Sequence, residues 1–204
     1  MFATGEALAL LAVFTTIYLL ANKWIFKLRQ RSRAQAEEAK ENRQNLTDYP
    51  EGSQLILVDI NGKFESILNE KIDKLPGISL EKFYVTDAAD MHEIPDGSVD
   101  AVVSQYALCS CDKATSVLAE VKRILAPGGK YYFIEHVVNK NSLWRRMLQK
   151  IWGYIFLGCN AAKDTGLMLR EAGFSTLNMK ECDLYKFNFI FMVSGYGIYG
   201  TATK

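Results

Sequence analysis

Residues 99–138 constrain the fold of this chain more than any other stretch, because strand, helix, turn and strand patterns follow one another there without a gap. The run 99–104 is short and β-branched, which suits a strand buried on both faces of a parallel sheet. The run 131–138, rich in β-branched and aromatic residues, predicts a second strand. With the helical pattern between them, the unit is strand, crossover helix and parallel strand, which is half of a doubly wound α/β sheet.

The helix between these strands has its own start and stop signals. Asp112 can cap its N-terminus, and Lys122 and Arg123 suit its C-terminus because the helix macrodipole favours cations there. The Pro-Gly-Gly turn at 127–129 follows and separates the helix from the next strand. The apolar residues that recur at helical spacing are Val117, Leu118, Val121, Ile124 and Leu125.

Three segments carry a resemblance to a known family: "LILVDINGKFE" at 55–65, "DMHEIPDGSVDAVVS" at 90–104 and "LAPGGKYYFIEH" at 125–136. They resemble motifs of the Rossmann-like class I S-adenosylmethionine-dependent methyltransferases. The chain is most similar to the membrane-anchored methyltransferase-like seven family, which includes alkyl-thiol S-methyltransferases. The resemblance covers residues 49–204. It implies a mostly parallel sheet with an antiparallel last strand, and S-adenosylmethionine as cofactor.

The resemblance also implies a set of cofactor contacts near the ends of the strands. Asp59 closes a predicted strand, where an acidic side chain accepts hydrogen bonds from both ribose hydroxyls, and Ile60 follows it. Asp90 and Met91 lie where the family contacts adenine, and Ser104 is a further cofactor contact. Simpler explanations stay open, because Asp59 before an Asn-Gly pair suits an ordinary turn and Met91 suits a core position.

One defining device of the family is missing from this sequence. We find no first strand ending in a Gly-x-Gly-x-Gly loop, whose lack of side chains lets the backbone approach the cofactor. We therefore expect the central strand of the sheet to be absent and the cofactor site to lack one wall. In the alternative, 54–60 is itself the first strand. Asp59 and Gly62 would then form a shortened cofactor loop, and Asp87 would be the acid that binds the ribose. This assignment matches the family less well, because the motifs that follow would include one strand too few.

The N-terminal region predicts attachment to a membrane. Residues 7–21 are almost wholly apolar, which is marginal for a span of about 20 residues, so a tilted span, a monotopic helix and a hairpin partner all remain open. A basic cluster follows this run, which opposes a cleaved signal peptide and places the following domain in the cytosol. We expect an anchor at 1–27 on endoplasmic reticulum or lipid droplets, a polar linker or helix at 28–48, and the methyltransferase-like domain at 49–204.

Composition excludes some partners. The formal net charge of +1 gives no basic field, so nucleic acid is not an expected partner. The four cysteines show no secreted disulfide pattern, and the Cys109-x-Cys111 pair has no second half to complete a zinc site. We therefore predict reduced thiols and no metal. Membrane lipid and a small lipophilic thiol are the expected partners.

The remaining elements follow from local patterns. Residues 142–156 form a basic and aromatic amphipathic pattern that suits a membrane surface, a pocket lid or an ordinary packed helix. Gly173 is a candidate C-cap, and Gly195, Gly197 and Gly200 weaken the last predicted strand. In chain order we expect a strand at 54–60, a helix at 63–74, a strand at 80–85, helices at 142–156 and 163–172, and strands at 175–184 and 190–202.

These patterns lead to one hypothesis of function and one rival. Methyl transfer from a sulfonium to a thiolate neutralises two charges, so an apolar, aligned pocket supplies most of what is needed and no catalytic triad is required. His136, one of two histidines, is the candidate catalytic residue, because it could deprotonate a thiol with a pKa near 8.5, although a structural role stays open. The rival is a non-catalytic membrane-bound domain that binds protein or lipid.

Overall fold

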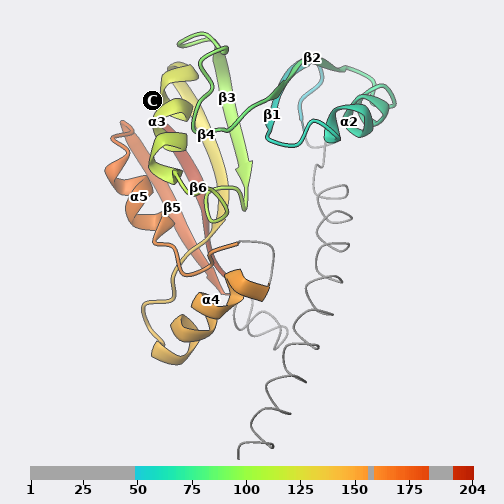
Figure 1. Cartoon of the computed structure of the whole chain (residues 1–204). Coiled ribbons are helices and arrows are strands. Elements are labelled where there is room, and N and C mark those ends of the chain that lie inside the picture. The colour runs from blue at the N-terminus through green and yellow to red at the C-terminus, as the bar shows by residue number, and fades with distance from the viewer. Residues whose placement is uncertain (1–48, 156–158, 184–194) are drawn as a thin grey trace, which may run out of the picture.

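The computed structural model describes residues 49–155, 159–183 and 195–204 (Figure 1). The predicted anchor at 1–27 and the linker at 28–48 lie outside these residues, as does the first part of the predicted strand 190–202. Within the described ranges, no helix is both long and apolar enough to cross a bilayer.

The observed elements match the predicted types and order. Most predicted bounds agree with the observed ones to within a few residues. The main exception is the strand predicted at 131–138, which begins at Leu125. In chain order the elements are β1 (Ser53–Asp59), α2 (Phe64–Ile72), β2 (Ile78–Val85), β3 (Val99–Gln105), α3 (Ala114–Ile124), β4 (Leu125–His136), α4 (Leu143–Ile155), α5 (Thr165–Glu171), β5 (Thr176–Asp183) and β6 (Tyr196–Thr203).

The strands form two separate sheets. The larger has the order β3-β4-β6-β5, with β3 and β4 parallel and β6 antiparallel to both of its neighbours. The smaller consists of β1 and β2, paired in parallel. Figure 1 shows this small sheet with α2 beside the edge strand β3. The mixed Rossmann-like sheet and its antiparallel last strand are thus confirmed.

Among the described residues β1 and β3 do not pair, so the sheet is interrupted where the first strand was expected to be missing. This finding opposes the alternative in which 54–60 is the central first strand, because a central strand would pair with β3. The structure therefore supports β1 and β2 as the counterparts of the family's second and third strands.

The main core lies between the large sheet and helices α3 and α5. On β4 the buried Tyr131 and Phe133 alternate with the exposed Tyr132, so one face of the strand packs and the other does not. β3 shows a similar alternation of half-buried and exposed residues. The prediction that 99–104 is buried on both faces is therefore wrong, because in the described part of the chain helices cover only one face of this sheet.

A second, smaller core lies between β1, β2 and α2. Leu55 and Ile72 are its buried members, and Leu57 packs against them. The alternate residues of β1, Ile56 and Val58, pack against the main core instead. Strand β1 thus contributes one face to each core, which keeps the small sheet on the large one without backbone pairing.

The ends of α3 differ from the prediction. Lys113 occupies the N-cap position and no side chain caps the helix, so Asp112 is not the cap. The helix ends at Ile124, since Leu125 already has extended dihedral angles, and β4 begins there rather than at 131. Ala126, the residue before Pro127, is restricted to extended conformations, so the helix has to end ahead of Ala126.

The glycines of β6 strengthen the strand rather than weaken it. A Cβ at Gly200 would lie 2.0 Å from the carbonyl oxygen of Asn178, and one at Gly197 would lie 2.7 Å from that of Glu135. Only glycine permits this close approach. The absent side chains let β6 pair on both sides, with β4 and with β5. Gly173, with φ +71°, directly follows Ala172, which is the C-cap of α5, so the predicted C-cap is one residue too late.

Candidate functional site

A buried carboxylate lies at the end of β4. The side chain of Glu135 is fully buried, and its Oε1 accepts hydrogen bonds from Ser104 Oγ at 2.9 Å and from the Ala107 backbone N–H at 3.1 Å. The Ser104 hydroxyl also pairs with the Tyr131 hydroxyl at 2.6 Å. Among the described residues, Oε2 of Glu135 has no hydrogen-bond partner. Burial raises the pKa of this carboxyl above its ordinary value.

Next to this carboxylate, three sulfur and nitrogen donors converge. Cys109 Sγ lies 3.4 Å from His136 Nδ1 and 3.4 Å from Cys159 Sγ, and His136 Nδ1 lies 3.1 Å from Cys159 Sγ. Cys109 is buried, whereas the other two are half-buried. A hydrogen bond with Cys159, together with burial, raises the pKa of the Cys109 thiol. The cluster joins residues that lie 50 positions apart in the chain.

Main-chain and ring contacts hold this cluster in place. The Asn160 N–H donates to the Cys109 carbonyl at 3.0 Å, which ties the segment after α4 to the loop after β3. The Thr165 hydroxyl of α5 donates to the His136 carbonyl at 2.5 Å. The Tyr106 ring stacks on the His136 imidazole at 4.4 Å between centroids. Tyr106 has φ 53°, an uncommon conformation for a bulky residue, so the loop turns sharply to place this ring.

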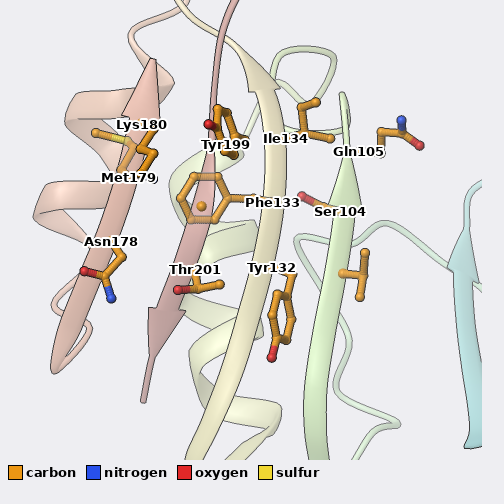
Figure 2. A pocket seen from close by; sticks show the side chains of 12 residues that line it. Ser104, Gln105, Tyr132, Phe133, Ile134, Asn178, Met179, Lys180, Tyr199 and Thr201 are labelled. Atoms are coloured by element: carbon orange, nitrogen blue, oxygen red, sulfur yellow. The ribbon is translucent and has the colours of Figure 1, made fainter. Parts of the chain in front are cut away.

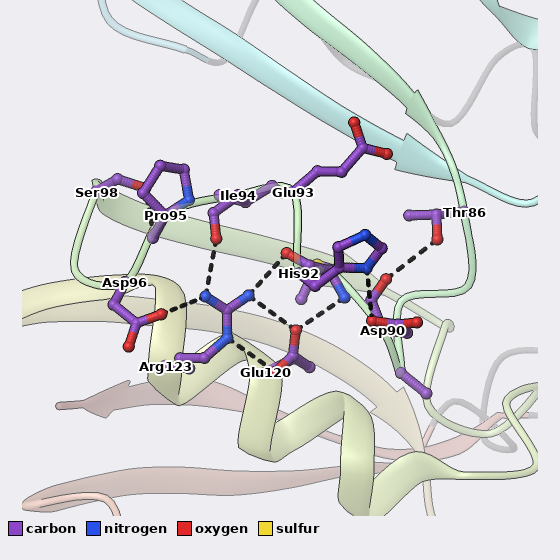
Figure 3. A network of polar contacts seen from close by, with 12 residues as sticks. Thr86, Asp90, His92, Glu93, Ile94, Pro95, Asp96, Ser98, Glu120 and Arg123 are labelled. Atoms are coloured by element: carbon purple, nitrogen blue, oxygen red, sulfur yellow. Dashed lines mark hydrogen bonds and ion pairs between the residues drawn. The ribbon is translucent and has the colours of Figure 1, made fainter.

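The loop between β2 and β3, which holds Asp90 and Met91, is fastened to α3 by a polar network (Figure 3). Arg123 donates to the carbonyl oxygens of Met91 at 2.7 Å and Ile94 at 2.8 Å, and to both carboxylate oxygens of Glu120 at 2.9 Å. It also pairs with Asp96 at 2.5 Å. Glu120 accepts the Met91 N–H at 2.8 Å, and the Arg123 hydrogen bond lowers the pKa of Glu120.

The two predicted adenine contacts, Asp90 and Met91, lie in different environments. The Met91 side chain is buried in the main core. Asp90 is exposed, and its carboxylate pairs with His92 Nδ1 at 2.9 Å, which lowers the pKa of Asp90. The core position of Met91 is the simpler of the two explanations offered by the sequence. Its role in binding adenine stays a prediction.

The predicted ribose acid is the last residue of β1. Asp59 is half-buried, and its Oδ1 accepts the Asn61 N–H at 2.8 Å, as in the local turn that the sequence suggested. The described residues place no donor on Oδ2, which leaves that oxygen for a ligand. Ile60 is 75% exposed. Asp59, Ile60 and Asp90 belong to the small sheet and its loops, whereas Ser104 and His136 belong to the large one.

An open groove of about 620 Å³ crosses the middle of the large sheet (Figure 2). Three consecutive residues from each of β3, β4, β5 and β6 line it, including Ser104, Tyr132 and Tyr199. Ligands of open α/β sheets bind outside the carboxyl ends of the strands, not across their middle. We therefore do not assign a cofactor to this groove, which is the sheet face that helices α3 and α5 leave uncovered.

The sequence analysis missed two of these features. Glu135 is two residues from Phe133 and four from Tyr131, so strand periodicity places an acidic side chain on the buried face, and this signal was present. The other missed feature is the thiol cluster. The sequence pattern pairs Cys109 with Cys111, but Cys111 lies outside the cluster. Cys159 meets Cys109 only because the segment after α4 packs beside the loop after β3.

Comparisons with known proteins agree with the fold. Residues 34–133 match the family model described as "Methyltransferase domain". Human thiol S-methyltransferase TMT1A is 36% identical over 140 residues, which are 67% of this chain and 57% of that protein. The chain thus spans little more than half of the length of this relative.

Solved structures show the same fold at low sequence identity. A SAM-dependent methyltransferase from Thermotoga maritima superposes with a TM-score of 0.57 at 17% identity, over 88% of this chain and 99% of that one. A phosphoethanolamine N-methyltransferase from Haemonchus contortus, solved with S-adenosylhomocysteine, also gives 0.57 at 17% identity, over 80% of this chain and 46% of that one.

Proposed function

Because this chain belongs to the class I S-adenosylmethionine-dependent methyltransferases, we propose that it methylates small lipophilic thiols with S-adenosylmethionine as cofactor. The observation that carries this proposal is the 36% identity with a human thiol S-methyltransferase over 140 residues. The strands expected on the two sides of the cofactor crevice, β1 and β3, are both present, although they belong to separate sheets.

The described residues fit one half of the cofactor. Asp59 at the end of β1 has a free carboxylate oxygen for the ribose hydroxyls, and Asp90 lies in the loop after β2, where the family contacts adenine. The glycine-rich loop that would cradle the methionine half is absent from the sequence. We therefore expect the nucleoside half of S-adenosylmethionine to contribute most of its affinity.

The chemistry makes few demands on side chains. S-adenosylmethionine supplies an activated methyl group, and the chain has only to align a thiol sulfur with it and to exclude water. A free thiol is about a few per cent thiolate at pH 7 and is intrinsically nucleophilic. Nδ1 of His136 faces two protein sulfurs, so this ring nitrogen is engaged in contacts within the protein. His136 as a catalytic residue stays a prediction.

Membrane attachment belongs to the same proposal. Residues 1–27 would hold the chain on endoplasmic reticulum or lipid droplets with the domain in the cytosol, close to the lipid phase into which lipophilic thiols partition. Helix α4 supports a membrane-facing surface, since Leu143, Trp144 and Met147 are exposed beside basic residues. A chain that begins at Gln30 should lose membrane sedimentation after a high-salt wash. If it still pelleted with membranes, the anchor assignment would be wrong or incomplete.

The second candidate is a non-catalytic binding domain, and the lack of pairing between β1 and β3 in the described part of the chain favours it. Calorimetric titration separates the two functions. We expect S-adenosylmethionine and 5′-methylthioadenosine, which lacks the amino acid, to bind with similar affinity, and only S-adenosylmethionine, which carries the activated methyl group, to methylate an alkyl thiol. If neither compound bound at millimolar concentration, the enzymatic function would be excluded and the binding domain would be the remaining proposal.

A further inference from the structure

The cluster of Cys109, His136 and Cys159 is not used in the proposed methyl transfer. Its donor atoms all lie within 4.8 Å of one another and come from the loop after β3, the end of β4 and the segment before α5. We propose that these three residues bind one zinc ion. The sequence alone predicted no metal, because the third donor becomes visible only in the fold.

The distances suit a tetrahedral zinc ion. With Zn–S bonds of about 2.3 Å and a Zn–N bond of about 2.0 to 2.1 Å, two sulfur ligands lie about 3.8 Å apart and sulfur and nitrogen about 3.5 Å apart. The observed separations are 3.4 Å between the sulfurs, and 3.4 and 3.1 Å between Nδ1 and each sulfur. An ion requires each pair to separate by only a few tenths of an ångström, roughly, which rotamer adjustments provide.

The surroundings favour a dication over three uncharged groups. Cys109 is buried, its carbonyl accepts the N–H of Asn160 next to Cys159, and the His136 carbonyl accepts the Thr165 hydroxyl, so the donors converge without a ligand to pull them together. Two thiolates and one zinc ion sum to zero charge, which removes most of the cost of burying ions. The stacked Tyr106 ring holds the imidazole in the orientation that aims Nδ1 at both sulfurs.

A disulfide is the competing explanation for two sulfurs at 3.4 Å. It uses only Cys109 and Cys159 and gives no reason for an imidazole nitrogen in contact with both sulfurs. A zinc ion uses all three donors. With three protein ligands, zinc keeps a fourth position for water or for an exogenous ligand, which is the arrangement of an open site rather than of a closed structural one.

The test is the metal content of the full-length chain, purified in detergent under reducing conditions and incubated with zinc. We expect about one zinc per chain by elemental analysis after removal of weakly bound metal. Cys109→Ser and Cys159→Ser should lose it. Cys111→Ser and Cys182→Ser are matched controls, since both cysteines lie outside the cluster, and they should keep it.

Cobalt(II) substitution gives a second readout that needs no variant. The wild-type chain should show the intense visible bands of tetrahedral cobalt and a thiolate-to-cobalt charge-transfer band. A wild-type chain that binds neither metal, or that has two fewer titratable thiols after denaturation than its four cysteines, would overturn the proposal. Equal metal loss in the control variants would overturn it as well.

Discussion

The two sheets of this molecule are built from similar strands but are stabilised very differently. In the large sheet, β4 and β6 each have a paired strand on both sides, and a core of buried side chains from α3 and α5 covers one face. The small sheet has one pair of strands, one helix and a small core cluster whose buried members are Leu55 and Ile72. A two-stranded sheet of this kind is marginal by itself.

The difference shows where the missing strand has its effect. In the large sheet, the missing strand leaves only β3 without a neighbour on one side, and the core stays intact. The small sheet has no backbone pairing with the large sheet. Its position depends on the packing of Ile56 and Val58 against the main core and on the loop that Arg123 connects to α3. The predicted nucleoside contacts Asp59 and Asp90 lie on this weaker side, so cofactor affinity and the stability of the small sheet should rise and fall together.

Hydrogen exchange should show the contrast with the largest effect. We expect amides at 55–58 and 101–103 to exchange at least about 100-fold faster than those at 132–134, because β1 and β3 each face the gap while β4 is paired on both sides. Mass spectrometry of peptides from the full chain measures this. Equal, strong protection of all three strands would show that the sheet closes around the missing strand.

A matched pair of cavity variants should separate the two cores. Leu118→Ala on α3 should lower the free energy of global unfolding by about 2 to 5 kcal/mol, because the leucine is fully buried in the main core. Leu68→Ala on α2 removes the same atoms from a buried position of the small unit. It should accelerate exchange of β1 while shifting the global melting temperature less. Equal shifts in the two melting curves would mean that the sheets unfold as one unit.

Removal of the Arg123 side chain should loosen the connection between the sheets. Arg123→Ala leaves the carbonyl oxygen of Ile94 without its donor and removes one of the two donors to the carbonyl oxygen of Met91, and we expect a loss of about 2 to 3 kcal/mol in unfolding free energy. Arg123→Lys should restore only part of this, since an ammonium lacks the guanidinium fork. Arg170→Ala, an exposed change in α5, serves as the control in chemical denaturation and should leave the stability unchanged.

Asp59→Ala should weaken cofactor binding. The neutral side chain cannot accept the ribose hydroxyls, and the unpaired hydroxyls cost about 1 to 3 kcal/mol, which is enough to abolish measurable binding by a weak site. Asp73→Ala, which changes an exposed acid of the small unit, is the control and should bind as wild type does. An Asp59 variant with unchanged affinity in calorimetry would show that the strand is assigned to the wrong family position.

The smallest expected effect is a pH dependence that originates in Glu120. The hydrogen bond from Arg123 lowers the folded pKa of this carboxyl below its ordinary 4.5, so its contribution is full above pH 4.5 and is lost as the pH falls through the lowered value. Glu120→Gln should therefore flatten the loss of stability on acidification. Denaturation midpoints between pH 6 and pH 3 that fall in parallel for both proteins would exclude this source.

Local patterns in the sequence were enough to predict the types and order of the elements, whereas the antiparallel last strand and the absence of the central strand were implied by the resemblance to the methyltransferase family. These features depend on neighbours within a few residues, such as the periodicity of β4 and the Pro-Gly-Gly turn, or on the presence of a motif. The same local signals misjudged burial: the 99–104 run is apolar enough for two covered faces, yet the fold covers one. The anchor stays a prediction from residues outside the described part.

Only the tertiary structure decided which distant residues meet. Whether β1 would pair with β3 depended on the balance between backbone pairing and the packing of Ile56 and Val58 against the main core, which no single segment encodes. The Cys109 and Cys159 sulfurs meet across 50 residues because the chain returns past β4 before α5 begins. Such contacts arise from the packing of whole elements, and sequence spacing alone therefore could not predict them.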